Sequence, residues 1–121
     1  MPNQEVSLDR VFRALADPTR RAVLERLGEG PASVSQLAEP FGMALPSFAQ
    51  HLKVLEECGL LRSSKTGRVR TCELAPRPLV SAEHWMAGQL ALWQRRLDRF
   101  DAYVGELNRK EMTRGKRRKI R

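Results

Sequence analysis

The sequence from residue 33 to residue 59 reads SVSQLAEPFGMALPSFAQHLKVLEECG. Ser33 followed three residues later by Gln36 is the pattern of a capping box, and it predicts a short helix. After a turn of a few residues, apolar positions at helical spacing predict a second helix from Leu45 to Cys58, which Gly59 closes as a C-cap. A short helix, a turn and a second helix are typical of a helix-turn-helix motif.

The second of these helices is predicted to have one buried and one free side. Phe48, Leu52 and Leu55 follow a helical spacing and form the buried side. The N-terminal half of the free side suits DNA, because an amide such as Gln50 can bond two atoms of adenine and a lysine such as Lys53 can bind a phosphate. The candidate DNA-contacting residues of this helix are Pro46, Ser47, Ala49, Gln50, His51 and Lys53.

His51 lies beside the predicted buried face, and the sequence leaves two interpretations of it open. Either it contacts a phosphate or a base edge, or it is a histidine at the rim that is bonded within the fold. Glu56 and Glu57 repel phosphate, so we expect the far end of this helix to lie away from a duplex.

Upstream, apolar residues at helical spacing run from residue 8 to residue 27 and are interrupted before Pro18. Asp17 is a good N-cap, and Pro18 fits the first helical position because its missing N–H is not needed there. The sequence therefore predicts two helices with a corner between them. We expect Arg20 and Arg21, in the first turn of the second helix, to lie on a solvated or phosphate-facing surface.

Downstream, residues 62–74 read RSSKTGRVRTCEL and predict a β-hairpin. Gly67 lies in the middle, where the tip would be, and Val69 and Thr71 alternate with arginines in the second arm. The basic residues of the hairpin that we expect to contact DNA are Arg62, Lys65, Arg68 and Arg70. A basic hairpin directly after a helix-turn-helix favours a DNA-contacting wing. The alternative is a solvated edge whose charges discourage aggregation.

A long helix is predicted from about residue 81 to residue 110. Its apolar positions follow a spacing of four and three residues without a break, and they are Met86, Leu90, Trp93, Leu97, Phe100, Val104 and Leu107. A helix of about 30 residues is about 45 Å long, which is more than a domain of this size covers. A second copy of the same helix is the simplest partner, with the first helix joining it. The alternative is that this seam packs entirely on its own domain.

The chain has 121 residues and a net charge of +8, which favours a polyanionic partner such as nucleic acid. Residues 114–121 hold six basic side chains and no acidic one. We expect residues 1–110 to form one winged helix-turn-helix domain that includes the dimerisation helix 81–110. Residues 111–121 are expected to form a disordered basic tail, which either contacts polyanions or only aids solubility.

Several function classes are disfavoured by what the sequence lacks. Cys58 and Cys72 have no paired spacing that would indicate a disulfide framework or a zinc site. No leader peptide and no apolar run of membrane-spanning length is present, so we expect a cytoplasmic protein that does not bind membranes. His51 and His84 are the two histidines, and neither has a nucleophile or ligand constellation around it, so we do not expect an enzyme.

Four stretches of the chain resemble the ArsR family of winged helix-turn-helix repressors. They are ALADPTRR at residues 14–21, VSQLA at 34–38, HLKVLEECGL at 51–60, and Gly67 with Arg68. The resemblance covers roughly residues 8–105. It implies a mainly α fold with a small β-hairpin, a winged helix-turn-helix and a long C-terminal dimerisation helix. It also implies a bacterial homodimer, built on the first and last helices, that binds a palindromic operator and usually represses its own transcription unit.

The metal sensors of that family carry two cysteines in the third helix, which fall here on Ser33 and Ser35. A neutral hydroxyl is a poor ligand for a soft metal. The family's other site needs paired acidic and histidine ligands on the last helix, where this sequence offers only His84 near the start. The chain therefore resembles the metal-independent branch, and we expect no metal and no cofactor. Its effector is unknown, and Ala49 and Gln50 depart from the family's usual recognition helix.

Taken together, these patterns predict a homodimeric, sequence-specific DNA-binding regulator, most simply a repressor. One alternative is a nonspecific nucleoid-type or RNA-binding protein that uses the basic tail and the wing. Another is a winged-helix module for protein interaction, which would show no salt-dependent DNA binding.

Overall fold

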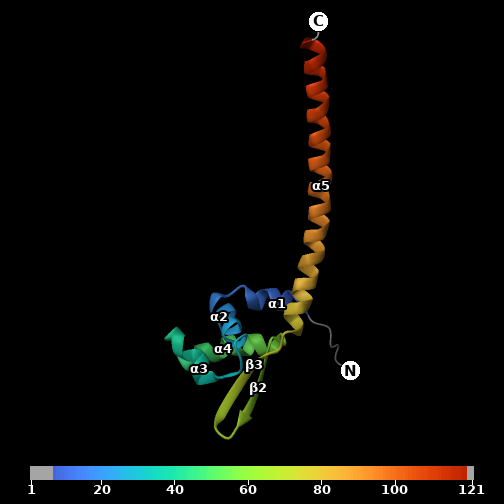
Figure 1. Ribbon diagram of the computed structural model, residues 1–121. Coiled ribbons are helices and arrows are strands. Elements are labelled where there is room, and N and C mark those ends of the chain that lie inside the picture. The colour runs from blue at the N-terminus through green and yellow to red at the C-terminus, as the bar shows by residue number, and fades with distance from the viewer. Residues whose placement is uncertain (1–6, 120–121) are drawn as a thin grey trace, which may run out of the picture. The chain divides into compact units, whose positions relative to one another are not determined.

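The computed structural model describes residues 7–119. Its elements in chain order are α1 (Leu8–Leu15), α2 (Pro18–Leu27), β1 (Ala32–Ser33), α3 (Val34–Ala38), the 3-10 turn η1 (Glu39–Phe41), α4 (Leu45–Glu57), β2 (Leu61–Thr66), β3 (Val69–Leu74) and α5 (Arg77–Lys119) (Figure 1). Residues up to His84 form one compact unit, and residues from Trp85 onward form a second. The predicted fold class, mainly α with a small β-hairpin and a long C-terminal helix, is confirmed.

Side-chain caps start two helices where the sequence predicts. Asp17 Oδ2 accepts the backbone N–H of Arg20 at 3.0 Å at the start of α2. Ser33 Oγ accepts the backbone N–H of Gln36 at 3.1 Å, and the Gln36 side chain accepts that of Ser33 at 2.9 Å, so α3 opens with a capping box. Each of these bonds satisfies a backbone N–H that a first helical turn leaves without a partner.

The recognition helix α4 ends one residue earlier than predicted, at Glu57. Gly59 follows with a φ of 81°, a left-handed conformation that glycine adopts without strain. The backbone N–H of Leu60 then donates to the carbonyl of Leu55 at 3.0 Å, which closes the helix end. The chain can therefore turn sharply from α4 into the first strand of the wing.

The wing is an antiparallel hairpin of β2 and β3, as predicted, but the sheet has a third strand. Its order is β1-β3-β2. Ala32 of β1 pairs with Cys72, and Ser33 pairs with Thr71. Two residues are too few to show the alternation from which a strand is predicted, so the sequence analysis missed β1.

The core of the first unit contains the predicted buried side of α4, since Phe48, Leu52 and Leu55 are all buried. The rings of Phe48 and Phe41 lie 5.4 Å apart between centroids. The other buried apolar residues are Val11, Ala14, Val23, Leu24, Leu27, Ala32, Leu37, Ala38, Leu60, Leu61, Cys72 and Ala82. This core holds α4 by one side only, which leaves the opposite side to solvent.

The last helix is longer than predicted, because α5 runs from Arg77 to Lys119 instead of from residue 81 to residue 110. The backbone of residues 111–119 is helical, and residues 120–121 lie outside the described part of the chain. A tail disordered in solution stays a prediction. Most residues from 111 to 119 are Glu, Met, Lys or Arg, which are good helix formers. Glu106 pairs with Lys110 at 3.9 Å and Glu111 with Arg114 at 3.7 Å, which stabilises a helix at these spacings.

Candidate nucleic-acid interface

The N-terminal half of α4 presents the predicted residues on the side opposite the core. Pro46, Ser47, Ala49, Gln50 and Lys53 are exposed, and His51 is half-buried. The first turn of α4 holds no acidic side chain, so nothing opposes the positive end of the helix dipole there. This half of α4 can therefore receive a phosphate or the edge of a base.

The C-terminal half of α4 is acidic and is tied to the wing. Glu56 Oε1 accepts the hydroxyl of Ser63 at 3.0 Å, which joins α4 to β2. Lys53 Nζ lies 4.0 Å from Glu57 Oε1, and both side chains are exposed. Exposed pairs of this kind contribute little, so a phosphate can replace Glu57 as the partner of Lys53. The carboxylates keep phosphates away from the far end of the helix.

The wing carries its basic residues in two different environments. Arg62 and Glu73 are register partners across β2 and β3, and their side chains form an ion pair at 3.6 Å. Lys65 and Arg70 are also register partners, so two like charges lie opposite each other near the tip, which is unfavourable in the free protein. Within residues 7–119, no acidic side chain lies within 4.0 Å of Lys65, Arg68 or Arg70. An anion between these three side chains would relieve the repulsion.

A charged cluster joins the corner between α1 and α2 to the recognition helix. Arg20 Nε donates to the carbonyl of Ala14 at 2.8 Å, and its Nη2 donates to the carbonyl of Arg13 at 3.0 Å. Its Nη1 lies 3.3 Å from His51 Nδ1 on α4. Of the two interpretations of His51, the structure shows the bond within the fold. Contact of the other ring nitrogen with DNA stays a prediction.

Of the two arginines expected on a solvated or phosphate-facing surface, Arg21 is exposed and Arg20 is half-buried. Arg21 Nη1 donates to the carbonyl of Leu15 at 2.8 Å. With the two bonds from Arg20, arginines of the next helix bond the last three carbonyls of α1, and the carbonyl of Arg13 also accepts the backbone N–H of Ala16 at 3.2 Å. The two arginines therefore join the start of α2 to the end of α1 and stabilise the corner. Their position just after the helix break is the one clue to this role in the sequence. Contact of either with phosphate stays a prediction.

Asp17 completes this cluster. Its Oδ2 lies 3.6 Å from His51 Nδ1, and the side chain is 28% exposed. The bond from the backbone N–H of Arg20 is the largest cause that lowers the pKa of Asp17, against an opposing effect of burial, with help from the charges of His51 and Arg20. Asp17 is therefore a carboxylate at neutral pH that caps α2 and faces the ring on α4.

The two cysteines are free thiols in the first unit. Cys72 is buried in the core, and Cys58 is half-buried with its Sγ donating to the carbonyl of Leu55 at 3.3 Å. Burial is the largest cause that raises the pKa of both thiols. A thiol with a raised pKa forms little of the reactive thiolate at neutral pH.

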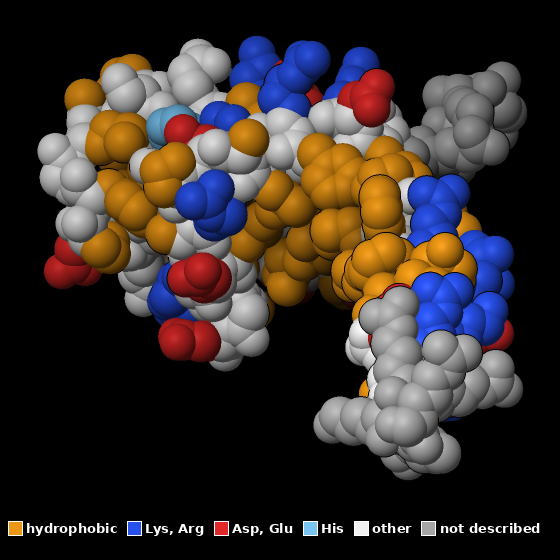
Figure 2. All heavy atoms as spheres, turned by 90° about the horizontal axis from the view of Figure 1, so that it is seen from above, with side chains coloured by type: hydrophobic (Ala, Val, Ile, Leu, Met, Phe, Trp, Pro, Cys, Tyr) orange, Lys and Arg blue, Asp and Glu red, His pale blue; other side chains and the backbone are white. Residues whose placement is uncertain are grey.

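The second unit shows the predicted apolar seam on an exposed helix. Leu90 is 69% exposed and Phe100 is 61% exposed. Viewed nearly end-on, α5 carries hydrophobic side chains along one side and much of its Lys and Arg along another (Figure 2). The residues of the seam are Met86, Leu90, Trp93, Leu97, Phe100, Val104 and Leu107, of which Val104 is half-buried. An exposed apolar stripe of this length is typical of an interaction surface.

Residues 15–64 match the family model described as a helix-turn-helix domain. An ArsR family transcriptional regulator of known crystal structure is 56% identical, and the match covers 72% of this chain and 96% of that one with a TM-score of 0.69. The chain belongs to the ArsR family. Its predicted winged helix-turn-helix fold is thereby confirmed.

Two further relatives are known transcriptional regulators. HTH-type transcriptional regulator Rv2034 of Mycobacterium tuberculosis is 43% identical over 75 residues, which is 62% of this chain and 70% of the relative. Transcriptional repressor SdpR of Bacillus subtilis is 30% identical over 79 residues, which is 65% of this chain and 88% of the relative. This ArsR-family protein is a DNA-binding transcriptional regulator.

At the family's metal positions the ArsR-family regulator has Ser33 and Ser35, and Ser33 serves as the cap of α3. Among residues 7–119, no group of three or more His, Cys, Asp or Glu side chains could hold a metal ion. Independence of metal stays a prediction. No helix in the same residues combines the length and apolar character of a membrane span.

Proposed function

We propose that this ArsR-family regulator is a homodimeric, sequence-specific repressor that binds a palindromic operator through α4 and the wing formed by β2 and β3. The observation that carries the proposal is the exposed N-terminal half of α4. It holds no acidic side chain and turns Ser47 and Gln50 away from the core. A helix with such a side fits the major groove, which is about 12 Å wide.

Each exposed side chain of α4 has a role that its chemistry allows. Gln50 bonds N6 and N7 of an adenine, and Ser47 bonds a base edge or a phosphate. Ala49 offers a methyl group to the methyl of thymine, and Lys53 binds a phosphate. The remaining candidates are Pro46, which contributes only van der Waals contact, and His51, which can donate through Nε2.

The wing contacts the phosphate backbone. Lys65, Arg68 and Arg70 lack acidic partners among residues 7–119, whereas Arg62 is paired with Glu73. The first three side chains therefore bind phosphates most strongly, and Arg62 contributes less because a phosphate has to compete with the carboxylate. Such contacts position the protein on the duplex without selecting a sequence.

The apolar seam on α5 is proposed to pack against the seam of a second copy, with α1 joining it. A two-fold dimer presents two copies of α4, and its operator is then expected to have two-fold symmetry as well. The relative named as a repressor supports the direction of regulation. A protein with this target acts in the cytoplasm, has no enzymatic activity and needs no cofactor or metal. Its effector is unknown.

The net charge of +8 favours one second candidate, a nonspecific nucleic-acid-binding protein. Footprinting on the DNA upstream of its own gene, followed by binding to the protected sequence and to a scrambled duplex at one salt concentration, separates the two functions. We expect a protected region with two-fold symmetry and at least about 10³-fold preference for it. Equal affinity for both duplexes would favour the nonspecific protein. No salt-dependent binding to either duplex would favour a protein-interaction module.

A further inference from the structure

Most of the net charge of this regulator lies beyond the apolar seam of α5. Residues 108–121 hold eight basic side chains and one acidic side chain, a net charge of +7 against +8 for the whole chain. The backbone of this segment is helical as far as Lys119. The twelve residues after Leu107 therefore form a basic helix about 18 Å long.

The seam itself does not continue into this basic helix. The spacing of four and three residues beyond Leu107 falls on Glu111 and Arg114, which are charged and exposed. A second helix packed on the seam meets apolar side chains only as far as Leu107, because burying unpaired charges is costly. The last turns of α5 are thus left for a partner of a different chemistry.

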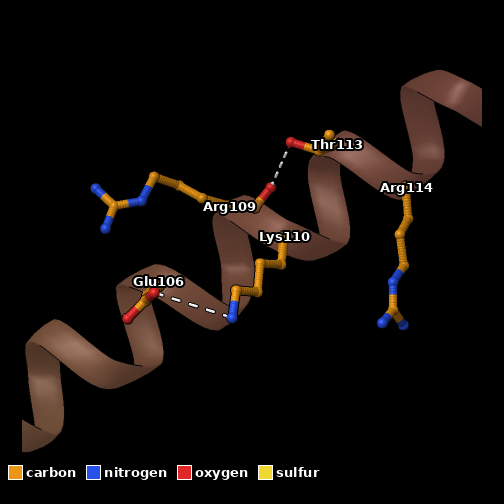
Figure 3. Close-up of a pocket in the computed structure, with 5 residues that line it drawn as sticks. All are labelled: Glu106, Arg109, Lys110, Thr113 and Arg114. Carbon is orange, nitrogen blue, oxygen red and sulfur yellow. Dashed lines mark hydrogen bonds and ion pairs between the residues drawn. The ribbon is translucent and has the colours of Figure 1, made fainter.

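Lys110 and Arg114 can exchange their acidic partners for a phosphate. Lys110 lies 3.9 Å from Glu106 (Figure 3). Arg114 lies 3.7 Å from Glu111, and both pairs are exposed and contribute little. Among the residues that the structure describes, Arg109 has no acidic side chain within 4.0 Å. A phosphate can therefore bind Arg109 directly and can displace the two glutamates from Lys110 and Arg114.

Arg109 and Arg114 do not share one face of the helix. They are separated by about 140° around the axis, and they reach out on different sides in Figure 3. Met112 is the one large apolar residue between 108 and 119. A helix that binds a membrane surface needs an apolar face, which this segment lacks. Basic side chains without an apolar face suit a phosphate backbone that is bound without base contacts.

We propose that residues 108–119 form a second DNA-binding element, which binds duplex phosphates independently of sequence and in addition to those met by α4 and the wing. The proposal rests on the proposed function in one respect, that duplex DNA is the polyanion that this regulator meets. The element raises the affinity for every duplex by the same factor and leaves the preference for the operator unchanged.

The test compares variants of the full chain in which basic residues are replaced by uncharged glutamine. One variant carries Arg109→Gln and Arg114→Gln, and the matched control carries Arg95→Gln and Arg99→Gln, which are exposed on the same helix before the seam ends. A third replaces all seven basic residues from 109 to 119 with Gln, a good helix former. Fluorescence anisotropy gives the Kd for the footprinted duplex and for a scrambled duplex between 50 and 200 mM NaCl. Circular dichroism and sedimentation confirm the helix and the oligomeric state.

Each phosphate contact changes the slope of log K against log salt by about 0.9. We expect the slope to become shallower by about two or more in the first variant and by more in the third, equally on both duplexes, while the control keeps the wild-type slope. An unchanged slope in the third variant would overturn the proposal, and operator preference would still support base contacts by α4. Loss of operator preference in a folded third variant would also overturn it, because the element would then select sequence. The proposal would also be overturned, in favour of a membrane partner, if wild type and the third variant bound duplex DNA equally and only wild type bound anionic phosphatidylglycerol vesicles.

Discussion

Arg20 Nη1 lies 3.3 Å from His51 Nδ1, so one guanidinium joins the end of α1 to the recognition helix. An arginine N–H can only donate, so His51 Nδ1 is the acceptor in this contact. Arg20 is anchored at its other nitrogens by the carbonyls of Arg13 and Ala14. The position of His51, next to Gln50 on α4, is thus set by a residue of the neighbouring helix α2.

The acceptor at His51 can be kept or moved by substitution. In His51→Asn the amide oxygen reaches about as far as Nδ1, whereas in His51→Gln it reaches about as far as Nε2. We expect His51→Asn to keep operator affinity within about threefold, and His51→Gln to lose about five- to tenfold, the value of one hydrogen bond. Anisotropy on folded variants measures this. Equal losses in both variants would show that the bond to Arg20 does not position α4.

Base contacts and backbone contacts respond differently to substitution. Gln50→Ala should cost about 1–3 kcal/mol on the operator and little on scrambled DNA, because the lost bonds are specific to one base. Arg68→Ala with Arg70→Ala should weaken binding to all duplexes alike and flatten the salt dependence. Titrations of both duplexes at two salt concentrations check this. If Gln50→Ala loses the same fraction of affinity on scrambled DNA, its assignment to a base is wrong.

The middle of the apolar seam should control dimer formation. Leu97→Glu places a carboxylate where the second helix is proposed to pack, so dimerisation and operator binding should fall together. Ala102→Glu, on an exposed position off the seam, is the matched control and should leave both unchanged. Sedimentation at micromolar concentration gives the oligomeric state. A monomeric wild-type protein under these conditions would contradict the proposed dimer.

Asp17 should make the fold sensitive to acid. Its pKa is lower in the folded chain than in the unfolded chain, chiefly because of the backbone N–H of Arg20. The ionised carboxylate therefore stabilises the fold above the unfolded pKa, and this contribution is lost as the pH falls through the folded value. Asp17→Asn keeps a capping side chain without charge, so its Tm should fall less than that of wild type below about pH 4. Asp101→Asn on α5 serves as the control, and an identical pH profile for wild type and Asp17→Asn would contradict the assignment.

Metals and mild oxidants should leave operator binding unchanged. Burial raises the pKa of Cys58 and Cys72, so a disulfide reagent should react slowly with the folded protein and quickly in urea. Zinc and arsenite should not change the Kd for the operator. Release by metal that survives Cys58→Ser combined with Cys72→Ser would reveal a different metal site. Release by peroxide that either substitution abolishes would make the protein a thiol switch.

The parts of the fold that could be predicted depend on near neighbours in the chain. The capping box of Ser33 and Gln36 and the buried side of α4 follow from residues three or four apart, and the structure confirms them. These rules also separated the exposed side of α4 from its core side. Spacing alone therefore located the candidate DNA-contacting surface, although the contacts with DNA stay predictions.

The parts that were missed depend on distant or competing interactions. β1 exists because Ala32 and Ser33 meet Cys72 and Thr71, almost forty residues away. The bonds of Arg20 to the end of α1 depend on the angle at the corner, which spacing does not reveal. Residues 111–119 contain a run of like charges that suggests disorder, but helix propensity and the pair of Glu111 with Arg114 oppose it.

Ser33 is both the last residue of β1, paired with Thr71 of the wing, and the N-cap of α3. Ser33 thus connects the wing directly to the helix-turn-helix without a linker. A movement of the hairpin relative to α3 would have to break the pairing of Ser33 with Thr71 or disturb the first turn of α3. If α4 and the wing contact DNA as proposed, the spacing between their two contacts on the duplex is consequently fixed by Ser33. An inserted residue next to Ser33 would disturb both contacts at once.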